Sequence, residues 1–193
     1  MFILGVTGPS GAGKGTACQF LKELGFYHID TDRLVPGLYP KALPDLVRQS
    51  GPQIEENGTV NKKELASAAF SSREATNTLN SILHPLVMEE VSNLIQRAKQ
   101  DGFCGVAVDG AALLEAKGDA ICDKILCILS PATVRAKRVA QRDNIDENAI
   151  LQRFHAQKSD EFYVSNSDAV IVNDTPDQLK KDLLNLIKEW DHE

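Results

Sequence analysis

The segment at residues 8–16 constrains this chain more than any other part of the sequence. It reads Gly-Pro-Ser-Gly-Ala-Gly-Lys-Gly-Thr and is rich in glycine, with one lysine. The apolar run Phe2–Thr7 comes before it and predicts a strand buried on both faces. After it, apolar residues recur at helical spacing over residues 14–24, and Gly25 ends that predicted helix. A strand, a glycine-rich turn, a lysine and a helix, in this order, are the parts of a phosphate-binding P-loop.

The glycines allow backbone conformations and close approaches that side chains would obstruct. Successive N–H groups can then converge on phosphate oxygens, helped by the positive end of the helix that follows. Lys14 would reach the β- and γ-phosphates of ATP. We therefore expect an ATP site made of Gly11, Ala12, Gly13, Lys14, Gly15 and Thr16. The alternative is a glycine-rich turn between a strand and a helix that holds no ligand.

The residue after the lysine is usually Ser or Thr, whose hydroxyl helps to hold Mg²⁺. Here it is Gly15, and Thr16 follows. We expect Mg²⁺ as a cofactor, with Thr16 as the candidate ligand. Three alternatives stay open for Thr16: direct contact with the metal, contact through water, or no contact.

Five apolar segments predict strands, and helical patterns alternate with them. The predicted strands are residues 2–7, 26–29, 103–108, 124–129 and 169–172. Helices are predicted after Ser130-Pro131, from Asp146, and over residues 176–190. This alternation predicts an α/β fold of three layers, a five-stranded parallel sheet with helices on both faces. We expect a single P-loop kinase domain over residues 1–193, with two helical additions.

The first addition is an inserted helical lobe at residues 33–84, which we expect to bind the acceptor. Four prolines between positions 36 and 52 break its pattern repeatedly. Asn61, followed by Glu64, predicts a helix start there. Pro85 suits the first turn of another helix, whose apolar stripe runs to Lys99.

Two carboxylates, Asp30 and Asp32, directly follow the second predicted strand. Ligands of open parallel sheets bind beyond the carboxyl ends of the strands, so both side chains are expected on the rim that holds the P-loop. Phosphoryl transfer to an alcohol needs a carboxylate that accepts or orients the hydroxyl proton. We choose Asp32 for that role. The alternative is that Asp32 caps a helix that opens at Arg33. Both roles can also hold for different members of the pair.

The second addition is a helical lid at residues 131–165. Arg138 and Arg142 are four residues apart and so share one helical face, and Arg153 follows. Such a pair could close over the phosphates of ATP. The alternative is a solvated helix face whose arginines pair with Asp143 and its acidic neighbours.

Composition excludes several classes of partner. The net charge of −6 predicts no general attraction to nucleic acid or to an anionic membrane. No apolar stretch has the length of a signal peptide or a membrane span, so we expect a cytoplasmic protein. The four cysteines form no CxxC pair and are interpreted as buried thiols. A monomer is expected, with an oligomer as the alternative.

The motifs together resemble the dephospho-coenzyme A kinase family over nearly the whole chain. Beyond the P-loop, the resemblance rests on these segments: Asp30-Thr31-Asp32, Gly58 to Leu65, Leu79-Asn80 through His84-Pro85, Asp109 to Glu115, Arg138 to Asp143, Arg153 to Gln157, and Asp168 to Asn173. The resemblance implies ATP-dependent phosphorylation of the ribose 3′-hydroxyl of dephospho-coenzyme A, the last step of coenzyme A synthesis. Asp32 would be the base, and Lys14 and Arg142 would clamp the γ-phosphate.

The same resemblance implies further contacts. Arg138 and Asn173 would bind ATP, with Asn173 against the adenine. His84, Asp109 and Lys62 would bind the acceptor. For His84, a structural role at a helix start is the alternative.

The chain departs from the family pattern on the acceptor side. Asn61-Lys62 stands where Asp-Arg is usual, and lysine makes no planar two-pronged contact. Ala111-Ala112 stands where Pro-Leu is usual. Two other functions therefore stay open: a nucleoside monophosphate kinase or other small P-loop kinase, and a nucleotide-binding homologue without catalysis.

Overall fold

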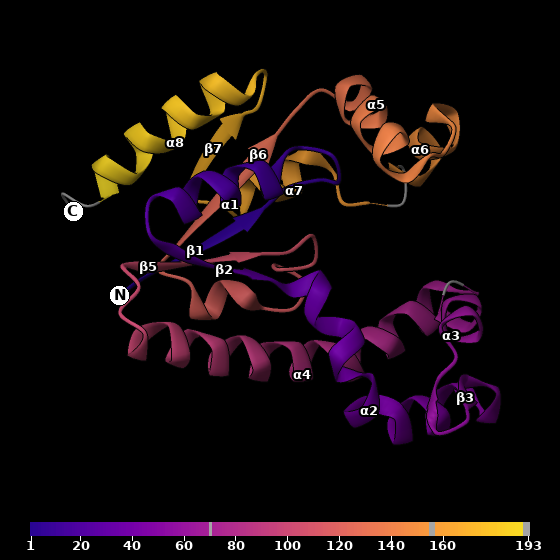
Figure 1. The fold of residues 1–193 in the computed structure, drawn as a ribbon. Helices are drawn as coiled ribbons and strands as arrows, with labels where there is room; N and C mark the ends of the chain where they lie inside the picture. Colours follow the sequence, from indigo (N-terminus) through magenta and orange to yellow (C-terminus); the bar gives the residue numbers. More distant parts are fainter. Residues whose placement is uncertain (70, 155–156, 191–193) are drawn as a thin grey trace. The chain divides into compact units, whose positions relative to one another are not determined.

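The computed structural model describes residues 1–69, 71–154 and 157–190, without the side chains of residues 148, 149, 152 and 153 (Figure 1). The chain forms two compact units. The first consists of Met1–Ile29 and Ala98–Glu193, and the second of Asp30–Arg97. Each unit has its own hydrophobic core.

The first unit is built on a parallel sheet of five strands. They are β1 (Phe2–Thr7), β2 (Phe26–Asp30), β5 (Gly105–Asp109), β6 (Lys124–Leu129) and β7 (Ala169–Val172), in the order β2-β5-β1-β6-β7. The central strand β1 is paired on both sides, with Val6 opposite Asp109 and Leu126. Because both neighbours and the faces cover it, its last four residues are fully buried. The predicted five-stranded parallel sheet is confirmed.

Two helices cover one face of this sheet. They are α1 (Lys14–Glu23) and α8 (Pro176–Trp190), which lie side by side in Figure 1. Apolar residues of both helices and of all five strands make the core, including Leu4, Leu21, Leu126 and Leu183. A short 3₁₀ helix, η2 (Gly118–Ile121), follows β5.

The described part of the predicted lid region contains three helices. They are α5 (Ala132–Asp143), α6 (Glu147–Phe154) and α7 (Asp160–Ser165). Ala136, Val139 and Ile150 form a small core of their own between α5 and α6. Arg153, predicted as a lid residue, has its side chain outside the described part of the structure.

The second unit is mostly helical. It holds α2 (Thr31–Ser50), η1 (Pro52–Ile54), the small hairpin of β3 (Glu55–Glu56) and β4 (Thr59–Val60), α3 (Lys62–Ala69) and most of α4 (Arg73–Gln100). Its core is Ala42, Leu46, Ile54, Leu65 and Leu83. Asn61 caps α3, since its Oδ1 accepts hydrogen bonds from the N–H groups of Lys63 and Glu64 at 3.2 Å each. The predicted helix start at Asn61 is confirmed.

Two predictions about this unit were wrong. Pro36, Pro40 and Pro44 do not break the chain into pieces but lie inside α2. All three are exposed and four residues apart, so the carbonyls that lose a partner face water. Pro85 does not begin a helix either, because α4 starts at Arg73 and continues through it.

Among the described residues, no helix combines the length and the apolar character that crossing a membrane requires.

Candidate functional site

The glycine-rich segment forms a tight loop at the carboxyl end of β1. Three of its glycines have positive φ: Gly8 at 133°, Gly11 at 79° and Gly13 at 105°. A Cβ at Gly8 would overlap the carbonyl oxygen of Ile128, and one at Gly13 would overlap the side-chain amide of Asn173. The predicted need for glycine at these positions is confirmed, because both the conformation and the space exclude a side chain.

Asn173 ties this loop to the opposite end of the chain. It follows β7, is buried, and its Nδ2 donates to the carbonyl oxygen of Ala12 at 2.7 Å. Its own backbone is fixed on both sides: the N–H donates to Leu129 O at 2.7 Å, and the carbonyl accepts from Ser130 Oγ at 3.2 Å. Its Oδ1 is buried and has no hydrogen-bond partner among the described residues.

Lys14 folds back over the loop. Its Nζ donates to the carbonyl oxygens of Gly8 at 2.9 Å and Pro9 at 3.4 Å. The ammonium group of Lys14 therefore lies against the loop, close to the place where a bound phosphate is expected. Gly15 and Thr16 follow in the first turn of α1, and both are exposed. Open space surrounds the position that a Cβ at Gly15 would take.

Arg138 and Arg142, the predicted lid arginines whose side chains the structure describes, differ in what they contact. Nη1 of Arg138 lies 3.5 Å from Gly11 O and 3.4 Å from Ser130 Oγ, so this guanidinium reaches the phosphate loop. Arg142 is largely exposed and makes a two-pronged pair with Asp143, with Nε–Oδ1 at 2.7 Å and Nη2–Oδ2 at 3.0 Å. This hydrogen bonding raises the pKa of the Arg142 guanidinium. The predicted pairing with Asp143 is thus confirmed for Arg142 in this conformation.

The two aspartates after β2 also differ. Asp30 is the N-cap of α2, and its Oδ1 accepts from the Arg33 N–H at 3.1 Å. Its Oδ2 pairs with the Arg33 guanidinium at 3.1 Å. Asp32 lies in the first helical turn, so the prediction that it could cap the helix is wrong. A cap must precede the first turn, and here the helix begins at Thr31, two residues before Arg33.

The remaining predicted residues lie in different parts of the fold. Asp109 is the last residue of β5, buried, on the same sheet edge as the phosphate loop. Lys62 and His84 belong to the second unit. Lys62 is exposed at the start of α3. His84 is half-buried in the interior of α4, so the alternative that placed it at a helix start is wrong.

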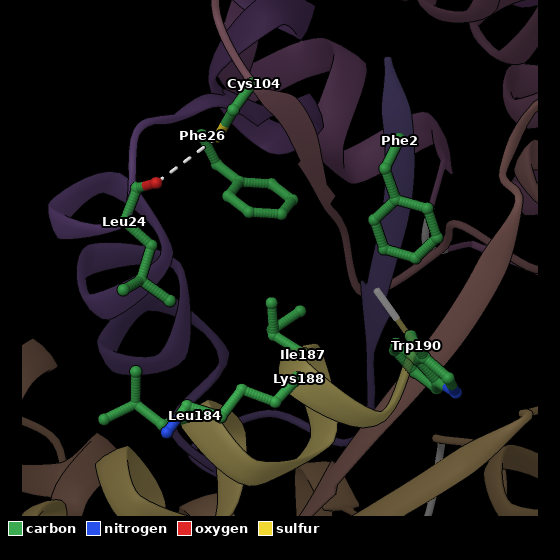
Figure 2. Close-up of a pocket in the computed structure, with 8 residues that line it drawn as sticks. All are labelled: Phe2, Leu24, Phe26, Cys104, Leu184, Ile187, Lys188 and Trp190. Atoms are coloured by element: carbon green, nitrogen blue, oxygen red, sulfur yellow. Dashed lines mark hydrogen bonds between the residues drawn. The ribbon is translucent and has the colours of Figure 1, made fainter. Parts of the chain in front are cut away.

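An apolar cavity of about 400 Å³ lies at the opposite edge of the sheet. Figure 2 shows its lining: Phe2, Leu24, Phe26, Cys104, Leu184, Ile187, Lys188 and Trp190. Phe2 and Phe26 are the first residues of their strands, so this cavity is at the amino ends of the strands. Ligands of parallel sheets bind at the carboxyl ends, and the phosphate loop is there.

Comparison with known proteins decides the family. The family model described as dephospho-CoA kinase matches residues 2–178. This chain belongs to the dephospho-CoA kinase family. Among curated members, the dephospho-CoA kinase of Corynebacterium glutamicum is 34% identical, over 98% of this chain and 100% of that protein. The one from Carboxydothermus hydrogenoformans is 31% identical, over 97% and 94%.

Solved structures agree on the fold. A dephospho-CoA kinase from Campylobacter jejuni superposes with a TM-score of 0.65 at 21% identity, covering 97% of this chain and 96% of that one. TT1252 from Thermus thermophilus gives 0.83 at 22% identity, over 97% and 96%. A shikimate kinase from Acinetobacter baumannii, solved with shikimate, gives 0.58 at 16% identity, over 98% and 94%. The fold of this dephospho-CoA kinase family member is therefore the α/β fold of P-loop kinases.

Three further side chains build the lid side of the loop. The sequence assigned none of them a contact there, although Gln157 belongs to the segment from Arg153 to Gln157 that carries the family resemblance. Ser130 bonds Asn173, and Gln157 Oε1 accepts from the Ser10 N–H at 3.3 Å. Arg135 is buried: its Nε donates to Ser130 O at 2.9 Å, and its guanidinium lies 4.8 Å from the ring centre of Phe154. Arg135 precedes Arg138 by three residues, and this helical spacing was the available signal.

The residues present fit ATP and its metal. A loop of positive-φ glycines at a helix start, with a lysine folded over it, is an anion cradle of the kind that holds phosphates. The exposed hydroxyl of Thr16 is of the oxygen type that Mg²⁺ prefers. Members of this family are P-loop kinases, so the chain is a kinase that uses ATP.

Proposed function

We propose that this chain transfers the γ-phosphoryl group of ATP to the ribose 3′-hydroxyl of dephospho-coenzyme A. A new bond forms between the 3′-oxygen and the γ-phosphorus, while the bond from that phosphorus to the β–γ bridging oxygen breaks. ADP leaves, and the 3′-hydroxyl gives up its proton. The observation that carries the proposal is a preformed phosphate loop in a chain that belongs to the dephospho-CoA kinase family.

On the donor side, the amides of Gly11 to Thr16 would hold the phosphates. Lys14 would turn from the loop carbonyls to the β- and γ-oxygens, a short movement for a flexible side chain. Arg138 supports this assignment because its guanidinium already reaches Gly11. Arg142 would have to exchange Asp143 for the γ-phosphate, and an exposed ion pair of this kind costs only about 0–1 kcal/mol to break.

Asn173 would have two roles, holding the phosphate loop and making the adenine contact that the family resemblance implies. Its amide nitrogen is used on Ala12, which leaves the buried Oδ1 as the atom able to accept from an adenine amino group. Mg²⁺, held at Thr16 directly or through water, would neutralise charge on the β- and γ-phosphates.

On the acceptor side, Asp32 would accept the 3′-hydroxyl proton. Asp30 serves as the helix cap, which supports giving the chemical role to Asp32. His84, Lys62 and Asp109 would bind the acceptor. Lys62 offers one compact ammonium where a guanidinium is usual, so this contact would hold the acceptor with less geometric restraint.

A panel of acceptors tests the substrate. ATP consumption would be measured with dephospho-coenzyme A, AMP, CMP and shikimate in parallel. We expect turnover with dephospho-coenzyme A and at most trace turnover with the others. Preference for AMP or CMP would assign a nucleoside monophosphate kinase, and preference for shikimate another small kinase. ATP binding without any phosphorylated acceptor would assign a non-catalytic homologue.

The base is tested by Asp32→Asn. We expect turnover at saturating substrates to fall at least about a hundredfold, because general-base catalysis contributes that much or more. ATP affinity, measured by calorimetry, should stay nearly unchanged, whereas Lys14→Ala should lower both turnover and ATP affinity.

Asp30→Asn is the matched control for this variant. Asparagine caps helices as well as aspartate does, so α2 keeps its start and the enzyme keeps its turnover. An Asp32→Asn enzyme as active as the Asp30→Asn enzyme would exclude Asp32 as the base.

A further inference from the structure

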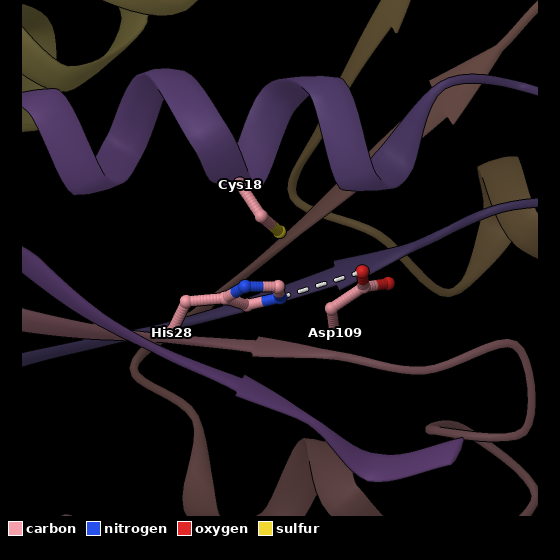
Figure 3. A group of neighbouring side chains, drawn as sticks. All are labelled: Cys18, His28 and Asp109. Atoms are coloured by element: carbon pink, nitrogen blue, oxygen red, sulfur yellow. Dashed lines mark ion pairs between the residues drawn. The ribbon is translucent and has the colours of Figure 1, made fainter. Parts of the chain in front are cut away.

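Three side chains of metal-binding type meet inside the first unit. Cys18 comes from α1, His28 from β2 and Asp109 from the end of β5, and Figure 3 shows all three pointing toward one another. One sulfur, one imidazole nitrogen and one carboxylate oxygen all lie within 4.8 Å of each other. His28 Nε2 and Asp109 Oδ2 are 3.5 Å apart. Three separate elements of the fold thus deliver one donor atom each to a single point.

These three side chains are largely buried. Cys18 is fully buried and Asp109 is 8% exposed. His28 Nε2 is buried and has no hydrogen-bond partner among the described residues, because its contact with Asp109 lacks the geometry of a hydrogen bond. Buried nitrogen and carboxylate groups are normally satisfied by hydrogen bonds or by a cation. A cation between them would satisfy both.

The set of donor atoms selects the class of cation. Mg²⁺ and Ca²⁺ prefer oxygen ligands throughout, whereas sulfur together with imidazole nitrogen suits borderline-soft ions such as Zn²⁺. Tetrahedral Zn²⁺ with bonds of about 2.0–2.3 Å sets its ligand atoms about 3.3–3.8 Å apart. The 3.5 Å between His28 and Asp109 already meets this requirement, and small side-chain rotations would bring the sulfur to it.

We propose that Cys18, His28 and Asp109 form a binding site for one Zn²⁺ ion, with water as the fourth ligand. Cys18 binds as the thiolate and gives its proton to the buffer. The site differs from the Mg²⁺ site at the phosphate loop in its donor atoms. It shares Asp109 with the proposed acceptor contacts, but Zn²⁺ binding is measured without acceptor, so its failure would leave the proposed function intact. Asp109 lies opposite Val6, two residues before the loop begins.

Metal titration of the full chain tests this proposal. The protein is first freed of metal with a chelator, and Zn²⁺ is then added in competition with a chromogenic chelator. We expect one equivalent to bind, and a large excess of Mg²⁺ to leave it in place. Co²⁺, which takes the same geometry and is coloured, should give a sulfur-to-cobalt charge-transfer band with the tetrahedral visible bands.

Single substitutions then assign the ligands. Cys18→Ser should remove the charge-transfer band and weaken Zn²⁺ binding at least about a hundredfold, since even loss of an outer-sphere partner costs up to that much. Cys104→Ser, an exposed thiol elsewhere, is the matched control and should leave binding unchanged. His28→Gln should also weaken Zn²⁺ binding strongly. His28 lies on β2 and Cys18 on α1, so His28→Gln is a second, independent test that can be used if Cys18→Ser fails to fold.

Two results would overturn the proposal. The first is a wild-type chain that binds no stoichiometric Zn²⁺ under these conditions. The second is a folded Cys18→Ser or His28→Gln chain, checked by circular dichroism, that binds Zn²⁺ as tightly as the wild type. Zn²⁺ bound without a sulfur band in the Co²⁺ spectrum would count with the second result.

Discussion

Gly13 and Gly15, two glycines of the phosphate loop, differ in whether a larger residue could replace them. Gly13 has a φ of 105° and faces the Asn173 amide, so Gly13→Ala combines backbone strain with a steric overlap. We expect a loss of about 1–3 kcal/mol in the free energy of unfolding, with ATP binding abolished. Urea unfolding and calorimetry measure the two effects.

Gly15→Ala is the contrasting change. The Cβ enters open space in the first turn of α1, and alanine favours helix, so we expect a gain of about 0.5–1 kcal/mol. If Gly13→Ala and Gly15→Ala had the same free energy of unfolding, this assignment of the loop conformation would be contradicted.

The four cysteines differ in solvent exposure. The number of cysteines that react rapidly with a thiol reagent at pH 8 measures this difference. Cys104 is exposed, while Cys18 and Cys127 are buried. Burial raises the pKa of Cys122 to about 12 and that of Cys127 to about 11, with Asp160 adding to the second shift and Lys14 opposing it. Since the thiolate is the reactive form, we expect one rapid equivalent.

Cys104→Ser should remove that rapid phase. More than one rapid equivalent in the wild type would show that the buried cysteines are open to solvent. The sequence interpretation of four buried thiols was wrong for Cys104, which is exposed, and held only in part for Cys122, which is partly buried. Cys104 lies just before β5, outside the strand that the sequence predicted to include it.

At the scale of the element, α2 shows how a helix tolerates three prolines. Val35, Tyr39, Ala42 and Leu46 recur at helical spacing and pack into the core of the second unit, while the prolines take the exposed face. The apolar stripe thus stabilises a helix that propensity alone disfavours.

Pro40→Ala should therefore stabilise this helix. It restores an N–H donor on the exposed face, and the gain exceeds the roughly 0.4–1 kcal/mol that proline contributes by stiffening the unfolded chain. We expect slower amide hydrogen exchange over residues 36–44, and Pro85→Ala in α4 provides a comparison at another internal proline. Faster exchange in Pro40→Ala would show that the prolines are required for the path of α2.

Elements with complete local signals were predicted well. The strands β6 and β7 and the helix α8 have the bounds that the sequence indicated, because apolar runs and a leading proline mark their ends. The hairpin β3–β4 and the helix α7 were missed. Strands of two residues and a helix of six carry too few residues for any periodicity to show.

The sequence predicted the local part of the site, the phosphate loop, better than the contacts that distant residues make with it. The phosphate loop is local in sequence, so its glycines and Lys14 could be found from spacing alone. The contacts of Arg138 and Asn173 with the loop span more than a hundred residues and depend on the fold. For the same reason no spacing rule indicates Cys18, His28 and Asp109 as a group.

At the scale of the whole molecule, two cysteine thiols and one tyrosine phenol that burial keeps protonated limit the stability of the fold at high pH. Burial raises the pKa of Cys122 and Tyr163 to about 12, and that of Cys127 to about 11, from ordinary values of 9.0 for the thiols and 10.0 for the phenol. Above pH 9 the unfolded chain releases protons that the folded chain retains. Stability is therefore full below pH 9 and declines as pH rises toward 12.

Urea unfolding at pH 8, 9, 10 and 11 measures this decline. The double variant Cys122→Ala, Cys127→Ala should show a shallower slope, because two of the three groups are removed. A wild-type free energy of unfolding that stays constant from pH 8 to 11 would contradict the assigned shifts.

The hydrogen bond from Asn173 to Ala12 joins residues that are 161 positions apart. During synthesis on the ribosome, the glycine-rich segment emerges long before the residue that fixes it. A nascent chain halted before Asn173 would carry the whole nucleotide motif and still lack its anchor. We therefore expect competence to bind ATP only in chains that have been extended past Asn173.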